Sequence, residues 1–476
     1  MPSIKKNFFY SSILTTSNFL FPMITYPYVS RVLGPNNLGI VNFVEGIIGY
    51  FILFSMLGVA TIGIREVSKN RDNKTELSNV FSSLVSITGF TTIISIIILL
   101  ICTFTVPVLY EKKEVMFYGA FRLAFNFLLI EWFYKGLENF RYITVRTLIV
   151  KLLYVISVFL FVRSSNDYGK YYLCTVGMFL INALVNFIYS RKFVFFSLKN
   201  IHIKKYLRPS LIMFGYGLLT SLYTTFNVTY LGFVSSDSQV GYYTTATKLY
   251  SILIALFSAF TGVMLPRMSH ILSKGDIEQF KTLTRKSNDT LLSFSIPLII
   301  FAAYFAPEII LLISGPEYGD AVLPFRIVIP LVFIIGYEQI LVIQTLMPLG
   351  KDKIILRNSI IGAIVGVGLN IILVKSLQST GSAITWICSE ISILICSQIA
   401  VTKSLKTRFP FRPLIKALLA YSPVIIFLIF FTYFIPNEYI RLFAGGFCLC
   451  VYFLIIQMLF YKNGVFLGVV KNFYKK

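Results

Sequence analysis

The chain has 476 residues, of which 56% are hydrophobic and only 13% are charged, and its mean hydropathy is +0.78. A chain of this composition could not expose its surface to water without aggregating, which excludes a soluble globular protein and indicates a polytopic membrane protein. The formal net charge of +23 would suit a nucleic-acid-binding protein only if the basic side chains gathered on one face with aromatic residues between them.

Apolar stretches long enough to cross a bilayer recur along the chain. A helix needs about 20 mostly apolar residues to cross the ~30 Å hydrocarbon core, because lipid offers no hydrogen-bond partner to the backbone. Stretches such as VSITGFTTIISIIILLICTF are apolar on every face, whereas the core helices of soluble proteins are amphipathic. The first stretch is too long for a secretory signal, so we treat it as a retained helix. The sequence predicts fourteen spans, at 8–30, 39–63, 78–105, 114–134, 142–162, 169–190, 209–234, 241–266, 288–313, 320–347, 355–374, 381–402, 414–435 and 441–461.

Basic residues concentrate in alternate loops between these spans. The segments REVSKNRDNKTE and RKFVFFSLKNIHIKKYLR and the tail KNFYKK lie on the side of the N-terminus, whereas the opposite loops SSDSQ and SGPEYGD carry no Lys or Arg. This is the positive-inside pattern of membrane proteins, and it explains the net charge without a nucleic-acid partner. Both termini are therefore expected to be cytoplasmic, which requires an even number of spans.

Matching residues suggest that the spans form two related halves. Gly39 begins the second span and Gly241 begins the eighth. In each case an arginine follows the glycine after the same number of residues. Arg122 in the fourth span and Arg326 in the tenth also occupy matching positions. We therefore expect an all-α fold of two pseudo-symmetric six-helix lobes, an arrangement that suits alternating access. The expected parts are an N-lobe at 1–190, a basic cytoplasmic linker at 191–208, a C-lobe at 209–402, and two further helices with a basic cytoplasmic tail at 403–476.

No residue cluster in the sequence indicates catalysis, a metal or a cofactor. All six cysteines fall within predicted spans, and the two histidines lie in loops without neighbouring thiols or clustered carboxylates. A membrane glycosyltransferase or polysaccharide polymerase is an alternative, but such enzymes usually carry acidic residues in a large extramembrane loop. Here the largest loop is basic and has roughly twenty residues, which is short for a catalytic domain. We expect no enzyme activity.

The segment EWFYKGLENFRYITVRTLIVK, residues 131–151, places six charged residues between two apolar runs. Glu131, Lys135 and Glu138 are spaced as one stripe of a helix, which predicts ion pairs that brace the hairpin between the fourth and fifth spans. The three basic residues that follow are five positions apart, so they wind round the helix and cannot all face one cavity.

Basic residues inside the spans are candidates for binding an anion. Lys151 is expected ~15 Å along its helix, near the bilayer centre. A charge there costs about 2.5–3.5 kcal/mol on insertion scales, so it needs water, a counter-ion or a substrate. Because arginine and lysine suit phosphate groups, we expect an anionic diphosphate or glycan to be bound by five residues: Lys151, Arg122, Arg326, Lys248 and Arg146. For the three nearest the outer surface, Arg122, Arg326 and Lys248, contact with lipid headgroup phosphates is the alternative.

Three embedded carboxylates are candidates for ion coupling or for a gate. The sequence contains no nucleotide-binding loop of the Walker type, so an ion gradient is the expected energy source, with Glu338 or Glu390 as the coupling group. An internal pair with a structural role is the alternative. Glu45 in the second span and Lys248 in the eighth lie at similar predicted depths and could pair in an outer gate, unless both merely face headgroups.

Four segments resemble signatures of a known transporter family. RVLGPNNLG, the hairpin at 131–151, TLMPLGK and GSAITWICSE resemble those of O-antigen and capsular polysaccharide repeat-unit flippases, over residues 1 to about 402. This family belongs to the multidrug/oligosaccharidyl-lipid/polysaccharide exporter superfamily. The segment RVLGPNNLG departs from the family in one place. It has Asn37 and Leu38 before its last glycine, where the family usually has an acidic and an aromatic residue.

The resemblance implies export of an undecaprenyl-diphosphate-linked oligosaccharide from the inner to the outer leaflet of a bacterial cytoplasmic membrane. It implies a lipid-linked oligosaccharide as substrate, with membrane lipids, a polysaccharide polymerase and assembly proteins as partners, and no cofactor. A cation-coupled drug exporter and a peptidoglycan-precursor flippase of the same superfamily are the alternatives within transport. A non-transporting scaffold for polysaccharide assembly is the alternative outside it.

Overall fold

The computed structural model describes residues 4–197 and 201–457, and in these residues every regular element is a helix. Nine described helices are long and apolar enough to cross a membrane, or up to twelve if each of three bent pairs counts as one span. Two of the nine are unusually long and are interrupted by a residue outside the helical region, Gly34 with φ 72° and Gln378 with φ 51°. The predicted basic tail and the end of the last predicted span, from 458 onward, lie outside the described residues.

The chain divides into two compact units, and each is described here by itself. Unit 1 comprises residues 1–244 and 370–378, and unit 2 comprises residues 245–369 and 379–476. Two helices contribute to both units, α11 (Asp237–Ser273) and α17 (Lys375–Leu405). The other elements of unit 1 are α1 (Ile4–Met56), α2 (Val59–Asn70), α3 (Lys74–Thr105), α4 (Pro107–Glu111), α5 (Lys113–Asn126), α6 (Glu131–Gly136), α7 (Phe140–Phe161), η1 (Ser165–Asp167), α8 (Tyr168–Ser190), α9 (Ile203–Thr224), α10 (Phe226–Val234) and the π-helical turn η4 (Asn370–Val374).

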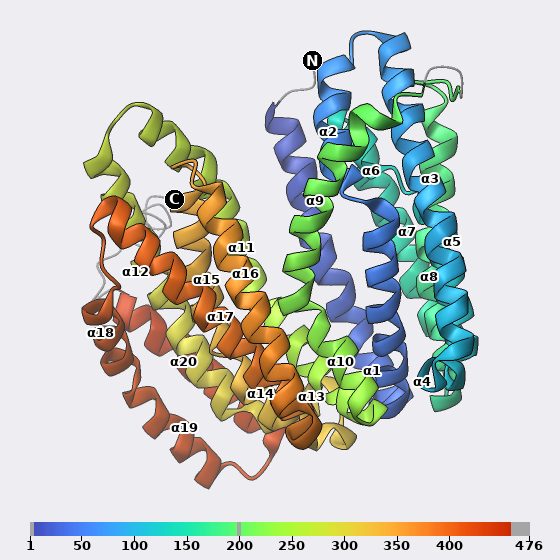
Figure 1. Ribbon diagram of the computed structural model, residues 1–476. Coiled ribbons are helices and arrows are strands. Elements are labelled where there is room, and N and C mark those ends of the chain that lie inside the picture. The colour runs from blue at the N-terminus through green and yellow to red at the C-terminus, as the bar shows by residue number, and fades with distance from the viewer. Residues whose placement is uncertain (1–3, 198–200, 458–476) are drawn as a thin grey trace. The chain divides into compact units, whose positions relative to one another are not determined.

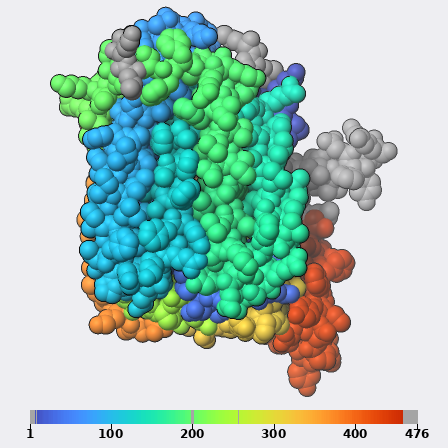
Figure 2. All heavy atoms as spheres, turned by 90° about the vertical axis from the view of Figure 1, so that its right-hand side faces the viewer, coloured from blue at the N-terminus to red at the C-terminus, as the bar shows by residue number. Residues whose placement is uncertain are grey.

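The ends of the unit 1 helices follow from their sequence. The Asn73 side chain accepts hydrogen bonds from the first free N–H groups of α3, and Asn139 does the same for α7. The chain reverses within α1 near Gly34, whose positive φ is accessible to glycine at no steric cost, and Figure 1 shows the two arms of this helix. Helices α3, α5, α8 and α7 then stand side by side, as Figure 2 shows.

A buried cluster joins α2, α3 and the short helix α6. Phe81 of α3 packs against Trp132 and Phe133 of α6, with ring centroids 6.2 and 5.1 Å apart. Glycine is required opposite these rings, because a Cβ on Gly63 of α2 would overlap the Trp132 side chain. This packing fixes α6, and with it the charged hairpin, against the rest of unit 1.

Unit 2 is built around a long helix that is sharply bent at its end. The axis turns by 76° between α12 and α13 at Phe305, and the Asp276 side chain caps the start of α12. The last three helices pack on α12 through buried side chains such as Leu292, Ile296 and Tyr421. The elements of this unit are α12 (Ile277–Tyr304), α13 (Ala306–Ser314), η2 (Pro316–Ala321), α14 (Val322–Val328), α15 (Leu331–Leu341), the π-helical turn η3 (Val342–Leu346), α16 (Asp352–Leu369), α18 (Phe411–Tyr421), α19 (Pro423–Phe434) and α20 (Glu438–Ile456).

Candidate functional site

An ion pair in unit 1 joins two residues that the sequence marked separately. Glu45 of α1 pairs with Arg122 of α5, and Tyr172 of α8 donates a hydrogen bond of 3.1 Å to the second oxygen of Glu45. The Arg122 guanidinium also lies 3.9 Å from the centroid of the Phe179 ring. Three helices are therefore tied together at one point, and the charge of Arg122 is matched by a carboxylate.

A second ion pair lies in the hairpin. Arg146 of α7 is buried, with 5% of its side chain exposed, and it pairs with Glu131 of α6 at 2.8 Å. It also donates to the Asn186 side chain on α8 and, at 2.9 Å, to the Thr147 hydroxyl. Arginine needs several partners when it is buried, and here they come from α6, α7 and α8. Arg146 thus clamps these helices, and its predicted contact with substrate stays a prediction.

The predicted stripe of charges along the hairpin is interrupted. Lys135 and Glu131 pair at 3.7 Å as the spacing suggested. The helix ends at Gly136, however, and Glu138 has a φ of 58°, so this residue does not continue the stripe. Glu138 instead pairs with Arg71 at the end of α2, at 3.2 Å. The brace therefore reaches a neighbouring helix, because the chain turns before a second helical turn of α6 can form.

Lys151 has contacts of a different kind. Its ammonium group donates to Ser17 Oγ at 3.0 Å and to Asn18 Oδ1 at 2.6 Å, both on α1, and lies 5.7 Å from the Phe21 ring. These partners are neutral, and no carboxylate lies within 4.0 Å of this ammonium in the part of the chain that the structure describes. Lys151 is therefore a charged, half-buried side chain of α7 without a direct ion pair to any described carboxylate, and Glu131 acts on it only from beyond 4.0 Å.

The remaining two predicted anion-binding residues lie in unit 2. Arg326 of α14 is exposed, and its Nε donates to the Ala303 carbonyl at 3.0 Å. Lys248 of α11 is half-buried. Arg326 and Lys248 thus lie in one unit, whereas Lys151, Arg122 and Arg146 lie in the other.

The two candidate coupling carboxylates of unit 2 face each other. The carboxyl groups of Glu338 on α15 and Glu390 on α17 lie close enough to influence each other's charge, and Trp386 donates its ring N–H to Glu390 at 3.0 Å. The Trp386 ring in turn meets Tyr250 edge to face, with centroids 5.1 Å apart. The π-helical turn η3 begins four residues after Glu338. Single π-helical turns inside α-helices are rare and occur frequently at functional sites.

Sequence reasoning missed most of the neutral partners at these sites. Ser17, Asn18, Tyr172 and Asn186 are ordinary polar residues in apolar helices, and nothing in their local pattern sets them apart. Trp386 could have been found, because it precedes Glu390 by one helical turn. In residues 4–197 and 201–457, no group of three or more His, Cys, Asp or Glu could hold a metal ion.

Comparison with known proteins adds the following similarities. A family profile described as "Polysaccharide biosynthesis protein" matches residues 4–272. A protein of Escherichia coli (strain K12) named "Putative O-antigen transporter" is 27% identical over 399 residues, which cover 82% of this chain and 94% of that protein. The lipid II flippase MurJ, in an inward closed conformation, matches the structure with a TM-score of 0.77 at 16% identity, over 95% of this chain and 99% of that chain. An inward-facing multidrug resistance MATE family transporter of the MOP superfamily matches with a TM-score of 0.64 at 14% identity, over 81% of this chain and 95% of that chain. At these identities the two solved structures establish a common fold.

Proposed function

The chain belongs to the polysaccharide biosynthesis protein family, and on that basis we propose that it is a flippase for lipid-linked oligosaccharides. The proposed substrate is an undecaprenyl-diphosphate-linked repeat unit for O-antigen or capsule, moved by alternating access. The name of the Escherichia coli relative and the fold shared with transporters support this assignment. The relatives are transporters rather than enzymes, so we assign no catalytic activity.

The proposed setting is the bacterial cytoplasmic membrane, with both termini in the cytoplasm. We propose fourteen spans, which requires counting each of the three bent pairs as one span and dividing each of the two longest helical stretches at its non-helical residue, Gly34 or Gln378. Two six-helix lobes followed by two further helices remain our proposal for the pseudo-symmetry. A polysaccharide polymerase and assembly proteins are the proposed partners, because a flipped repeat unit must be consumed by a polymerising reaction.

The observation that carries the proposal is that Lys151 has no direct ion pair with any described carboxylate. A charged group in the hydrocarbon region costs about 2.5–3.5 kcal/mol on insertion scales and is rarely kept without a function. Arg122 and Arg146, in contrast, already have carboxylate partners. We therefore assign the diphosphate first to Lys151, and place Arg326 and Lys248 as further contacts to the glycan or diphosphate in the other unit.

The test compares two substitutions of Lys151 in cells that depend on this protein for surface polysaccharide. Lys151→Gln should abolish export at normal protein levels, because the amide keeps hydrogen-bonding capacity but removes the charge. Lys151→Arg should retain a substantial part of export, because the charge stays. Unimpaired export by the Lys151→Gln protein would overturn the assignment. Proteoliposomes with a fluorescent lipid-linked oligosaccharide would measure flipping directly.

A second candidate function, a cation-coupled drug exporter, is favoured by one observation. Cationic substrates require acidic groups in the membrane, and unit 2 contains the facing pair Glu338 and Glu390. We propose that this pair holds the coupling proton of the flippase instead, since two carboxylates in contact cannot both ionise at low cost. The same proteoliposomes, supplied with a cationic drug, distinguish the two functions. Drug transport without oligosaccharide flipping would favour the exporter, and flipping of lipid II alone would favour a peptidoglycan-precursor flippase.

A further inference from the structure

We propose that unit 1 carries a loading site for a polyprenyl diphosphate lipid along α7 and α8, in which Arg141 binds the diphosphate and the groove between the two helices holds the chain. The proposal rests on the proposed function and adds a site that is separate from Lys151. It starts from three adjoining hollows whose lining changes from polar to apolar.

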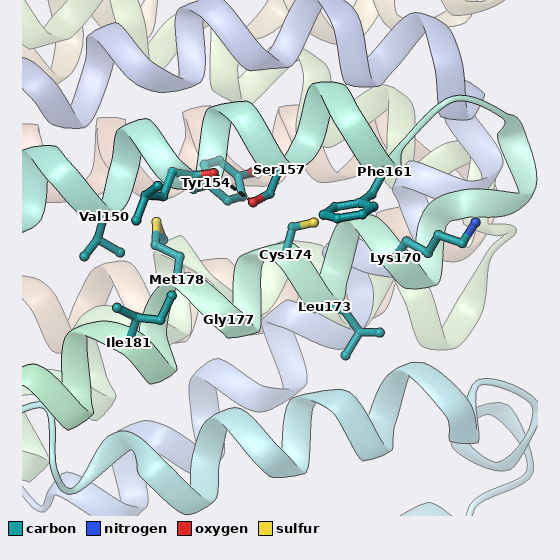
Figure 3. A pocket seen from close by; sticks show the side chains of 11 residues that line it. Val150, Tyr154, Ser157, Phe161, Lys170, Leu173, Cys174, Gly177, Met178 and Ile181 are labelled. Atoms are coloured by element: carbon teal, nitrogen blue, oxygen red, sulfur yellow. Dashed lines mark hydrogen bonds between the residues drawn. The ribbon is translucent and has the colours of Figure 1, made fainter.

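The first hollow, of about 690 Å³, lies where the N-terminal part of α1 meets the end of α2 and the hairpin. The second, also about 690 Å³, shares Asn139 and Arg141 with the first and continues along α7. The third, about 360 Å³, shares Val150, Leu153 and Ile181 with the second and runs between α7 and α8, as Figure 3 shows. The shared residues make the three hollows one trough. One end suits a polar group, and the remainder is lined mostly by apolar side chains that suit a hydrocarbon chain, with Arg146 in the second hollow and Lys170 in the third.

Arg141 stands at the junction of the polar and apolar parts. Its side chain is exposed, and it makes no hydrogen bond or ion pair with any residue in 4–197 or 201–457. Arg146, five residues further along α7, is buried and has three partners. Five residues turn a helix by about 140°, so the two guanidinium groups leave α7 in different directions. Arg141 is therefore the arginine of α7 that is available to a ligand, and its planar group suits a diphosphate.

The polar end of the trough has the side chains that a glycan requires. Carboxylates and amide oxygens accept hydrogen bonds from sugar hydroxyls, and amide N–H groups donate to sugar oxygens. The basic residues here outnumber the acidic ones, which favours an anionic headgroup. The polar lining consists of Asn7, Tyr10 and Asn139, the acids Asp72 and Glu138, and the bases Lys6, Arg71 and Arg141.

The length of the apolar part indicates which lipid it fits. From Arg141 to Phe161, α7 advances ~30 Å, which is the full thickness of the hydrocarbon core. A glycerophospholipid chain extends through one leaflet only, about half of that distance. A polyprenyl chain can follow the whole groove, so we commit to this occupant.

The walls of the groove are apolar and open. Ile149, Leu153 and Ile181 expose 54%, 47% and 41% of their surface. A Cβ built on Gly177 of α8 would meet no heavy atom within 4 Å, so the groove has free space at this position. A larger side chain at Gly177 would therefore fill the groove without displacing a neighbouring residue.

The native cysteine Cys174 reports on this groove, because it lines the third hollow beside Gly177 (Figure 3). The experiment uses the full chain with the other five cysteines replaced by serine, and measures the rate at which a lipid-soluble maleimide labels Cys174. Undecaprenyl diphosphate should slow labelling, whereas undecaprenol and phosphatidylglycerol at the same concentration should not. A protein that keeps only Cys102, a half-buried residue of α3, is the matched control and should show no protection.

Two substitutions then test the two ends of the site. Arg141→Gln should raise the concentration needed for protection about tenfold, the effect of losing one charge-assisted hydrogen-bond donor. In the Gly177→Leu protein the new side chain fills the groove, so undecaprenyl diphosphate should no longer slow the labelling of Cys174. Arg412→Gln, at an exposed arginine of α18, and Gly368→Leu, at an open helical glycine of α16, are the controls and should leave protection unchanged.

The possible outcomes separate this proposal from the proposed function. Equal protection by phosphatidylglycerol would show a general lipid surface and overturn the loading site. Protection that persists in both the Arg141→Gln and the Gly177→Leu proteins would overturn it as well. In either case the proposed function stands if the wild-type protein still flips lipid-linked oligosaccharide. A wild-type protein that flips no such substrate would overturn the proposed function itself.

Discussion

One pair of embedded carboxyl groups in unit 2 is neutralised in a different way from the embedded carboxylates of unit 1. In unit 1, Glu45 pairs with Arg122 and Glu131 pairs with Arg146. In unit 2, Glu308 also pairs with an arginine, Arg441, but Glu338 faces a second carboxylate, Glu390, which accepts a hydrogen bond from the ring N–H of Trp386. An arginine is always charged, so the unit 1 pairs are fixed features of the fold. A pair of carboxyl groups can gain or lose a proton, so the unit 2 pair can change its charge during transport.

The comparison also separates structure from function along α7. Its three basic residues all lie in or beside the hairpin, yet Arg146 holds helices together and Lys151 contacts only neutral groups of α1. Arg141 makes no such contact in the described residues. A charge that is already neutralised contributes mainly to stability, and one that is not remains available to a substrate. The predictions below use this distinction, in order of decreasing effect on stability.

The largest loss of stability is expected from Arg146→Met. The substitution leaves the half-buried Glu131 carboxylate without its arginine and removes a donor from the Asn186 side chain. The loss removes three hydrogen bonds of a buried arginine but leaves Lys135 as a partner of Glu131, so it should cost about 3 kcal/mol and the purified protein should unfold at a clearly lower temperature. Arg141→Met on the same helix is the matched control and should change the free energy of unfolding by no more than about 0.5 kcal/mol. Equal shifts in the two proteins would show that Arg146 is not a structural clamp.

A smaller effect is expected at Glu45 and Arg122, because 37% of the Glu45 side chain is exposed. Glu45→Gln, Arg122→Gln and the double variant form a thermodynamic cycle of unfolding free energies. The coupling energy should be about 1 kcal/mol, since water screens a partly exposed pair. Strictly additive effects would mean that the ion pair contributes nothing to stability. That result would leave Glu45 available for the predicted outer gate with Lys248, which a cysteine pair at positions 45 and 248 would test by crosslinking.

The apolar pattern predicted the helical membrane fold, because lipid requires every backbone group to be bonded within a helix. The same pattern could not show that α6 is a separate short helix. Its end depends on the positive φ of Glu138 and on the close packing of Gly136 against Val67 of α2, neither of which is a periodic signal. The interrupted stripe of charges in the hairpin was missed for this reason.

The charged candidates were found from sequence because charges are rare in membrane spans. Their partners were mostly not found, because the contacts join residues far apart in the chain, 77 positions for Glu45 and Arg122 and 133 for Asn18 and Lys151. Such contacts depend on how the helices pack. The pair of Lys135 and Glu131 lies within one helix, and spacing alone was enough to predict it.

The smallest effect on stability is expected from Glu390→Gln. This substitution also tests whether the carboxyl pair of unit 2 is functional. An amide has nearly the shape of a protonated carboxyl group and can form a hydrogen bond with Glu338. The free energy of unfolding should therefore change by less than about 1 kcal/mol. Unit 2 provides its own control in Glu308, which pairs with Arg441 at 2.6 Å and has 9% of its side chain exposed. Glu308→Gln weakens a buried ion pair and should destabilise the protein by about 3 kcal/mol.

The effects on transport should be the reverse of the effects on stability, with Glu390→Gln impairing transport more than Glu308→Gln does. In proteoliposomes, an imposed proton gradient should no longer drive flipping by the Glu390→Gln protein, because the pair has lost the group that exchanges a proton. The Glu308→Gln protein, assayed below its unfolding temperature, should still respond to the gradient. If Glu390→Gln leaves the response intact while wild-type flipping depends on the gradient, the proton is carried elsewhere and the carboxyl pair has only a structural role. Two buried glutamates of one unit would then differ in their partners and not in their function.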